Sequence, residues 1–174
     1  TLAFQPQYSL TDNEMCGIEA LIRWQHPTKG FISPYHFIAV AEETGLINQI
    51  GFWVLETACR QISEWKREHD YQGRVAVNLS VKQLRHPDLI GTIQRSLTNT
   101  GCKPEWLELE VTEGYLMHDP DNAITQLEQL KSMGINLSID DFGTGYSSLS
   151  YLKKLPISKL KIDKSFVDDL PHDE

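Results

Sequence analysis

The sequence of 174 residues lacks any apolar run of about eighteen residues, the length needed to span a membrane. Its start, Thr1 to Leu10, also lacks the basic and then apolar layout of a signal peptide. Cysteine is scarce, because only Cys16, Cys59 and Cys102 occur and no two of them form a C-x-x-C pair. These absences argue against a disulfide framework and a zinc knuckle. We expect a cytoplasmic setting, although segments outside this sequence could attach a longer protein to a membrane.

Positive charge and metal-binding histidine spacings are also lacking. Sixteen Lys and Arg stand against 24 Asp and Glu, which gives a net charge of −8. This balance argues against a protein that holds long nucleic acid by neutralising many phosphates, but it leaves a small phosphate ligand open. Divalent cations would then be the bridge, because Mg²⁺ is held by carboxylates together with substrate phosphates. The six histidines show no H-x-x-x-H or H-E-x-x-H spacing, so no zinc site is predicted.

Short apolar or β-branched runs alternate with longer amphipathic stretches, which predicts an α/β fold. Helical spacing of apolar residues predicts helices over 50–65 and 124–133, and Trp53, Trp65 and Tyr151 are expected in the core. Helix starts are expected at Ser33-Pro34 and Asp119-Pro120, and helix ends at Gly45 and Gly134. The expected strands are Leu2–Leu10, Gly17–Trp24, Arg74–Ser80, Trp106–Glu113, Asn136–Phe142 and Lys159–Ile162.

This alternation predicts parallel strands joined by crossovers, in an open doubly wound sheet or in a barrel. The first two strands are the exception, because only Thr11–Cys16 separates them and so short a connection joins antiparallel neighbours. No G-x-G-x-x-G or G-x-x-x-x-G-K-[ST] motif follows a predicted strand, which removes the usual support for a nucleotide-binding open sheet. A barrel with an inverted first strand is therefore the favoured fold.

Polar side chains stand where the predicted strands end, the region in which α/β barrels gather their chemistry. Read singly, each has an ordinary explanation, such as a salt bridge between Glu19 and Arg23. Read together, the set matches the oxygen ligands that Mg²⁺ or Mn²⁺ prefers. Adjacent aspartates repel each other without a cation, and two metal ions flanking a phosphodiester can support in-line displacement by water. The donors are Glu19, Asn78, Glu110, Asp140 and Asp141.

Short motifs follow one another in a fixed order along the chain. They are Phe4-Gln5-Pro6, Glu19-Ala20-Leu21-Ile22-Arg23-Trp24, Ala41-Glu42-Glu43-Thr44-Gly45, Asn78-Leu79-Ser80, Glu110-Val111-Thr112-Glu113, Asp140-Asp141-Phe142-Gly143-Thr144-Gly145-Tyr146-Ser147-Ser148-Leu149 and Lys159-Leu160-Lys161-Ile162-Asp163. This series resembles the successive motifs of the EAL-domain cyclic di-GMP phosphodiesterases, a family named for Glu19-Ala20-Leu21. Three residues alone carry no weight, but the ordered series spans nearly the entire chain.

The resemblance implies metal ligands and a dinuclear site. In the family's pattern, the positions of Glu19, Asn78, Glu110 and Asp140 hold metal and Asp141 serves a second metal site. Two Mg²⁺ or Mn²⁺ ions are therefore expected as cofactors.

The resemblance also implies roles in catalysis and ligand binding. Lys161 matches the lysine beside the attacking water, while Gln5 and Arg23 match positions that contact the ligand, Arg23 through phosphate. Glu113 matches the glutamate that anchors the loop following Asp141, a loop that helps form the second metal site and a dimer contact. Gly114 replaces the serine that the family often carries at that position, a departure that leaves the anchor itself in place.

The fold implied is a TIM-like (β/α)8 barrel with an antiparallel first strand, in agreement with the short first connection. Such a barrel needs roughly 250 residues, whereas the sequence ends at Glu174, soon after the sixth expected strand. A glutamate that the family places on the seventh strand and a glutamine near the eighth have no position here. Residues 1–174 are interpreted as one EAL phosphodiesterase domain that is incomplete at its C-terminus.

The expected activity is metal-dependent hydrolysis of one phosphodiester bond of cyclic di-GMP to linear pGpG. The alternative is an inactive EAL domain that serves as a cyclic di-GMP receptor, but a pure receptor needs Arg23 and not the pair Asp140 and Asp141. An unrelated Mg²⁺-dependent barrel enzyme would share the acids without the ordered motifs. The resemblance further implies a sensory or cyclase-like GGDEF domain elsewhere in the protein, and it is compatible with a homodimer.

Overall fold

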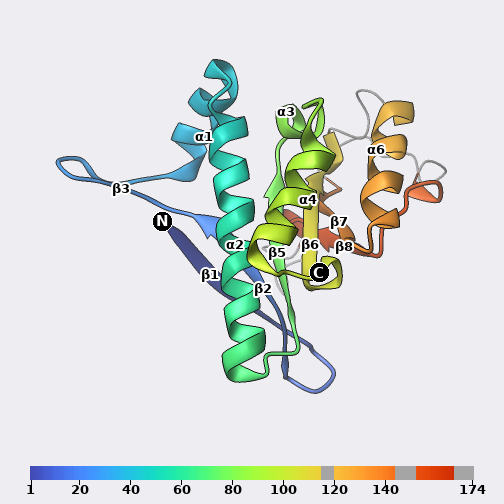
Figure 1. The fold of residues 1–174 in the computed structure, drawn as a ribbon. Coiled ribbons are helices and arrows are strands. Elements are labelled where there is room, and N and C mark those ends of the chain that lie inside the picture. Colours follow the sequence, from blue (N-terminus) through green and yellow to red (C-terminus); the bar gives the residue numbers. More distant parts are fainter. Residues whose placement is uncertain (115–119, 144–151, 167–174) are drawn as a thin grey trace, which may run out of the picture.

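A computed structural model describes residues 1–114, 120–143 and 152–166, which form a curled six-stranded sheet with helices packed against it (Figure 1). The strands are β1 (Leu2–Tyr8), β2 (Met15–Ile22), β5 (Arg74–Leu79), β6 (Leu107–Thr112), β7 (Asn136–Phe142) and β8 (Lys159–Ile162). They lie in the order β1-β2-β5-β6-β7-β8. β1 and β2 are antiparallel, and each later neighbouring pair is parallel.

This topology confirms the prediction of a TIM-like barrel fold with an inverted first strand. The curl of the sheet is strong enough to bring its two edge strands together. Lys159 of β8 donates a hydrogen bond of 3.3 Å to the side chain of Gln7 on β1. Side chains on the concave face of the sheet therefore converge on a common interior.

A short hairpin separates β2 from the first helix and was not predicted. It consists of β3 (Trp24–His26) and β4 (Gly30–Ile32). The expectation that the second strand continues to Trp24 is therefore wrong, because β2 ends at Ile22 and Trp24 begins the hairpin. Strands of three residues are too short to show an alternating pattern, so the sequence carries little signal for them.

The helices are α1 (Pro34–Thr44), α2 (Ile47–His69), α3 (Val81–Leu84), α4 (Leu89–Thr100) and α6 (Pro120–Ser132), with 3₁₀ turns η1 (Pro104–Trp106) and η2 (Lys164–Phe166). The predicted boundaries are confirmed where they are described. Pro34 occupies the first turn of α1, and Gly45 ends that helix with φ +79°. Gly134 follows α6 with φ +90°, a conformation that suits glycine. No helix within the described ranges combines the length and apolar content needed to cross a membrane.

The hydrophobic core lies between the convex face of the sheet and the helices. Leu107, Leu109 and Val111 of β6 are fully buried in one cluster with Ile62 of α2 and Leu97 of α4. Because side chains alternate along a strand, the residues between these apolar positions face the interior of the curl. The sheet is thus apolar on its outer face and free to carry polar groups on its inner face.

One predicted core residue lies on the surface. Trp53 of α2 is 46% exposed, so its assignment to the core is wrong. The buried stripe of α2 runs through Gly51, Val54 and Ala58, and Trp53 stands one position to the side of it. Trp65 is partly buried and packs edge-on against Phe4, with ring centroids 5.0 Å apart. Tyr151 lies outside the described residues.

Candidate metal and phosphodiester site

Three acidic side chains from different strands meet inside the curl of the sheet. Glu19 of β2, Glu110 of β6 and Asp140 of β7 each offer a carboxylate oxygen, and these atoms lie within 4.8 Å of one another. The strand register staggers them, since Glu110 is opposite Asn78 of β5, and Asp140, opposite Thr112, lies one inward-facing position farther along β7. The structure therefore joins residues that are more than a hundred positions apart in the sequence into one carboxylate cluster.

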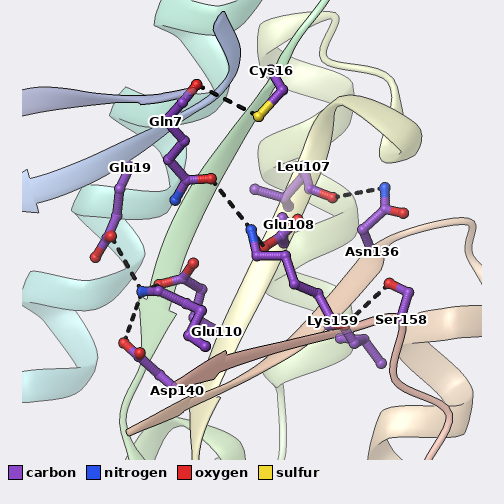
Figure 2. Close-up of polar contacts among 12 residues, drawn as sticks. Gln7, Cys16, Glu19, Leu107, Glu108, Glu110, Asn136, Asp140, Ser158 and Lys159 are labelled. Carbon is purple, nitrogen blue, oxygen red and sulfur yellow. Dashed lines mark hydrogen bonds and ion pairs between the residues drawn. The ribbon is translucent and has the colours of Figure 1, made fainter. Parts of the chain in front are cut away.

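The ammonium group of Lys161 on β8 sits at the centre of this cluster. Its Nζ lies 2.5 Å from Oε2 of Glu110, 2.9 Å from Oδ2 of Asp140 and 3.2 Å from Oε2 of Glu19. Figure 2 shows the three carboxylates turned toward one nitrogen atom from separate strands. The cluster thus has one common point at which a positive charge is stabilised from three sides.

Burial makes this point electrostatically strong. The side chain of Glu110 has no exposed surface, and its burial raises the pKa to about 7 in spite of the hydrogen bond from Lys161. Burial lowers the pKa of Lys161, but the hydrogen bond and charge of Glu110 outweigh it and the net pKa lies above the usual range. Among the described residues, Oε1 of Glu110 has no hydrogen-bond partner. A buried carboxylate with an unused oxygen is suited to a further cation.

Asn78 completes a donor set at the ends of β2, β5, β6 and β7. Its Nδ2 donates a hydrogen bond of 2.9 Å to Oε1 of Glu19, which places the amide at the edge of the cluster. Three carboxylates and an amide oxygen are hard ligands of the kind that Mg²⁺ and Mn²⁺ prefer. The residues present therefore fit a divalent cation held by Glu19, Glu110 and Asp140, with Asn78 as the neutral ligand.

Asp141 stands beside this cluster in a constrained backbone conformation. Its φ is +53°, which is uncommon for a residue with a side chain, and its N–H donates a hydrogen bond of 3.0 Å to Oδ1 of Asp140. Burial of its carboxyl group and the charge of Asp140 raise the pKa of Asp141 above its usual range. The two adjacent aspartates thus differ in exposure, since Asp140 is partly buried and Asp141 is exposed.

Glu113 fixes the start of the loop that follows Asp141. Its carboxylate is buried, and Oε2 accepts a hydrogen bond of 2.8 Å from the N–H of Gly143. Gly143 has φ +101°, and a Cβ atom there would lie 2.5 Å from the ring of Phe166. Glu113 therefore contacts the backbone at the start of the loop, and its role as an anchor stays a prediction because residues 144–151 lie outside the described part of the chain.

The two predicted ligand-contacting residues lie at the rim. Gln5 of β1 is exposed and stands directly opposite Glu19 in the antiparallel register. Arg23 follows β2, and its Nη1 donates a hydrogen bond of 2.9 Å to the carbonyl of Ile22. Arg23 and Asn78 both line a cavity of about 310 Å³ next to the cluster. The structure therefore places Arg23 on a cavity that Asn78 also lines, and it does not pair Arg23 with Glu19.

Two interior residues were missed by the sequence reasoning. Glu108 and Lys159 precede Glu110 and Lys161 by two positions, and they form an ion pair of 2.5 Å. The available signal was the repeated spacing, since residues two apart on a strand share a face. Charged side chains on the inner face of a sheet need partners of opposite charge. The sequence alone did not show which lysine would pair with which glutamate.

Comparison with known proteins identifies a family that this chain matches. The model of the EAL domain matches residues 1–174. The bifunctional diguanylate cyclase/cyclic di-GMP phosphodiesterase MucR of Pseudomonas aeruginosa is 49% identical over 172 residues, covering 99% of this chain and 25% of that protein. The cyclic di-GMP phosphodiesterase NbdA of the same organism is 45% identical over 170 residues, covering 98% of this chain and 22% of that protein.

A solved structure of a relative has the same fold. The PaMucR phosphodiesterase in complex with c-di-GMP superposes with a TM-score of 0.95 at 48% identity, covering 99% of this chain and 70% of that one. The chain thus spans about a quarter of the curated relatives it matches and less than three quarters of the solved domain. The match over all 174 residues, together with the carboxylate cluster, shows that the chain belongs to the EAL domain family.

Proposed function

We propose that this chain forms the substrate-binding and metal-binding part of a cyclic di-GMP phosphodiesterase, which hydrolyses one phosphodiester bond to give linear pGpG. The observation that supports this most directly is the convergence of Glu19, Glu110 and Asp140 on one cationic point. Its relatives in Pseudomonas aeruginosa named as cyclic di-GMP phosphodiesterases support the choice of substrate.

In this proposal Glu19, Asn78, Glu110 and Asp140 hold one Mg²⁺ or Mn²⁺ ion, and Asp141 contributes to a second. When bound, such a pair of ions lowers the pKa of water and stabilises negative charge on the phosphate. Lys161 contributes a fixed positive charge beside the attacking water and orients it. Its three carboxylate contacts keep it protonated, so it acts as a hydrogen-bond donor and not as a base.

Arg23 and Gln5 would bind the substrate away from the reacting water. A guanidinium group suits a phosphate oxygen because it donates two parallel hydrogen bonds. Glu113 would act at one remove, by holding the Gly143 amide and with it the start of the loop after Asp141. We further predict a homodimer that uses this loop. A sensory or GGDEF domain is predicted elsewhere in the protein.

The test is hydrolysis of cyclic di-GMP by the protein at its natural length, with Mn²⁺, with Mg²⁺ and with EDTA. Chromatography with mass detection should show pGpG with either ion and none with EDTA. Glu19→Gln should abolish turnover, whereas Glu56→Gln, on the exposed side of α2, should not. Binding of cyclic di-GMP by calorimetry without any product would overturn the enzymatic proposal and support the receptor alternative.

A further inference from the structure

A second charged layer lies in the interior beneath the carboxylate cluster. Nζ of Lys159 is 2.5 Å from Oε1 of Glu108, and it also donates a hydrogen bond of 3.3 Å to Oε1 of Gln7. Figure 2 shows Lys159 reaching from β8 toward Glu108 of β6 and Gln7 of β1. Glu108 is 6% exposed, whereas the side chain of Lys159 is 37% exposed, so Glu108 is the buried partner of this ion pair.

The two layers repeat the same arrangement. Lys159 and Lys161 are two residues apart on β8, and Glu108 and Glu110 are two residues apart on β6. Each lysine therefore reaches across β7 to a glutamate of β6, and both pairs lie at 2.5 Å. In the strand register Lys159 is opposite Ser138, which is opposite Glu110, so Lys159 reaches back by one inward-facing position to meet Glu108. We call Glu108 and Lys159 the lower pair, and Glu110 with Lys161 the upper pair.

β8 has few other features that hold its register. It contains four residues, and its outward side chains Leu160 and Ile162 are 43% and 68% exposed, so packing on that face contributes little among the described residues. Its pairing with β7 is irregular between Ile139 and Phe142. At one end Ser158 bonds the carbonyl of Leu137 through its N–H and its hydroxyl, at 3.0 and 3.2 Å. At the other end the N–H of Asp163 bonds the carbonyl of Phe142 at the longer distance of 3.4 Å.

A slip of one residue in β8 would turn both lysines outward and remove Lys161 from the carboxylates. The lower pair opposes such a slip, because Lys159 cannot leave the interior without abandoning the buried Glu108. We propose that the lower pair is a positioning device that sets the register of β8 and thereby places Lys161 in the site. The consequence for turnover rests on the proposed function, whereas the placement of Lys161 does not.

The test removes both charges at once, so that no unpaired charge stays buried. Glu108→Gln combined with Lys159→Gln is compared, in the protein at its natural length, with the matched control Glu56→Gln and Arg60→Gln. The control pair is an exposed ion pair of 2.7 Å on α2. Thermal unfolding confirms that each variant folds. Acetylation of Lys161 by acetic anhydride, followed by mass spectrometry, reports how firmly its amine is held without any need for turnover.

We expect acetylation of Lys161 to accelerate about fivefold or more in the double variant, and kcat to fall about tenfold or more with KM nearly unchanged, as for residues that orient a catalytic group. The single variant Lys159→Arg, in which Glu108 is unaltered and the ion pair is kept, should show an acetylation rate and a kcat close to those of the original protein. Unchanged acetylation in a folded double variant overturns the inference. Acceleration in a protein that shows no turnover even when unaltered supports the inference and overturns the proposed function alone.

If the double variant does not fold, Glu108→Asp takes its place. This change keeps both charges and shortens the acidic arm by one methylene group, so Lys159 must shift or lose its partner. A rise in the acetylation rate of Lys161 supports the positioning role, and an unaltered rate overturns it.

Discussion

Replacing Lys161 with methionine is the sharpest perturbation of the site, because it removes the cation on which the carboxylates converge. Glu19, Glu110 and Asp140 would then keep oxygen atoms within 4.8 Å of one another with no charge between them. At that separation two unit charges repel by about 3–4 kcal/mol with an effective dielectric constant of about 20. Without added metal, the variant should therefore be markedly less stable than the original protein.

Proton uptake limits this cost. The pKa of Glu110 is already raised to about 7 with the lysine in place, and loss of the lysine raises it further. A carboxyl group whose pKa is raised in the folded state stabilises the fold at low pH and loses that contribution as pH rises through its folded pKa. The gap between variant and original should thus be smaller at acidic pH than at alkaline pH.

The net loss should be about 3–5 kcal/mol near neutral pH, the usual cost of removing one partner from a buried ion pair. For a domain of this size that corresponds to a fall in Tm of about 10 °C. Added Mn²⁺ should raise the Tm of Lys161→Met by more than it raises that of the original protein, since the ion meets no competing ammonium group. Calorimetry in EDTA and in Mn²⁺ at two pH values tests this. Equal Tm values in EDTA, or a smaller Mn²⁺ shift in the variant, would refute the reasoning.

Two further predictions concern binding and packing. Asp141→Asn should remove most hydrolysis of cyclic di-GMP and spare much of the affinity, whereas Arg23→Ala should mainly weaken the affinity. Turnover assays and calorimetry on both variants test this division of roles. Equal losses of turnover and of affinity in each variant would contradict it. Gly51→Ala should destabilise the protein by about 1–3 kcal/mol despite the better helix propensity of alanine, because its Cβ would lie 2.0 Å from Nε2 of the buried Gln83. Gly91→Ala is the matched control: its Cβ would meet the flexible ends of two exposed side chains, Asp88 and Arg95, so urea unfolding should show no comparable loss.

Most of the sheet could be predicted because each main strand carries its own signal. The run from Arg74 to Leu79 and the run from Leu107 to Thr112 are apolar on the face that packs against helices, and both strands occur as expected. The hairpin of β3 and β4 could not be found in the same way. Its strands have three residues each and are held by pairing with each other, so their formation depends on contacts that a local pattern does not record.

The candidate site could likewise be predicted in part from the sequence. That Glu110 would face the interior follows from alternation along β6, whose other face is apolar. That Glu19, Glu110 and Asp140 would lie close together follows from their places in the second halves of parallel strands, whose carboxyl ends meet at one edge. The sequence does not show that these carboxylates surround the ammonium group of Lys161, because that contact depends on the curl of the sheet that carries β8 back toward β2. Lys161 was expected beside an attacking water, and in the structure it bonds all three carboxylates. Contacts across the interior depend on closure of the sheet, which no local stretch of sequence specifies.

The polar interior itself argues that this part of the chain is built for a ligand and not for stability. TIM barrels usually fill this space with branched apolar side chains. Here Glu108, Glu110, Lys159 and Lys161 occupy it, and replacing buried ion pairs by well-packed apolar residues is often neutral or stabilising. Buried charged groups that do not add to stability are expected where the charge has a functional role. The upper pair has such a role at the carboxylate cluster. The lower pair contacts no predicted metal or substrate, so its role is to keep the upper pair in place.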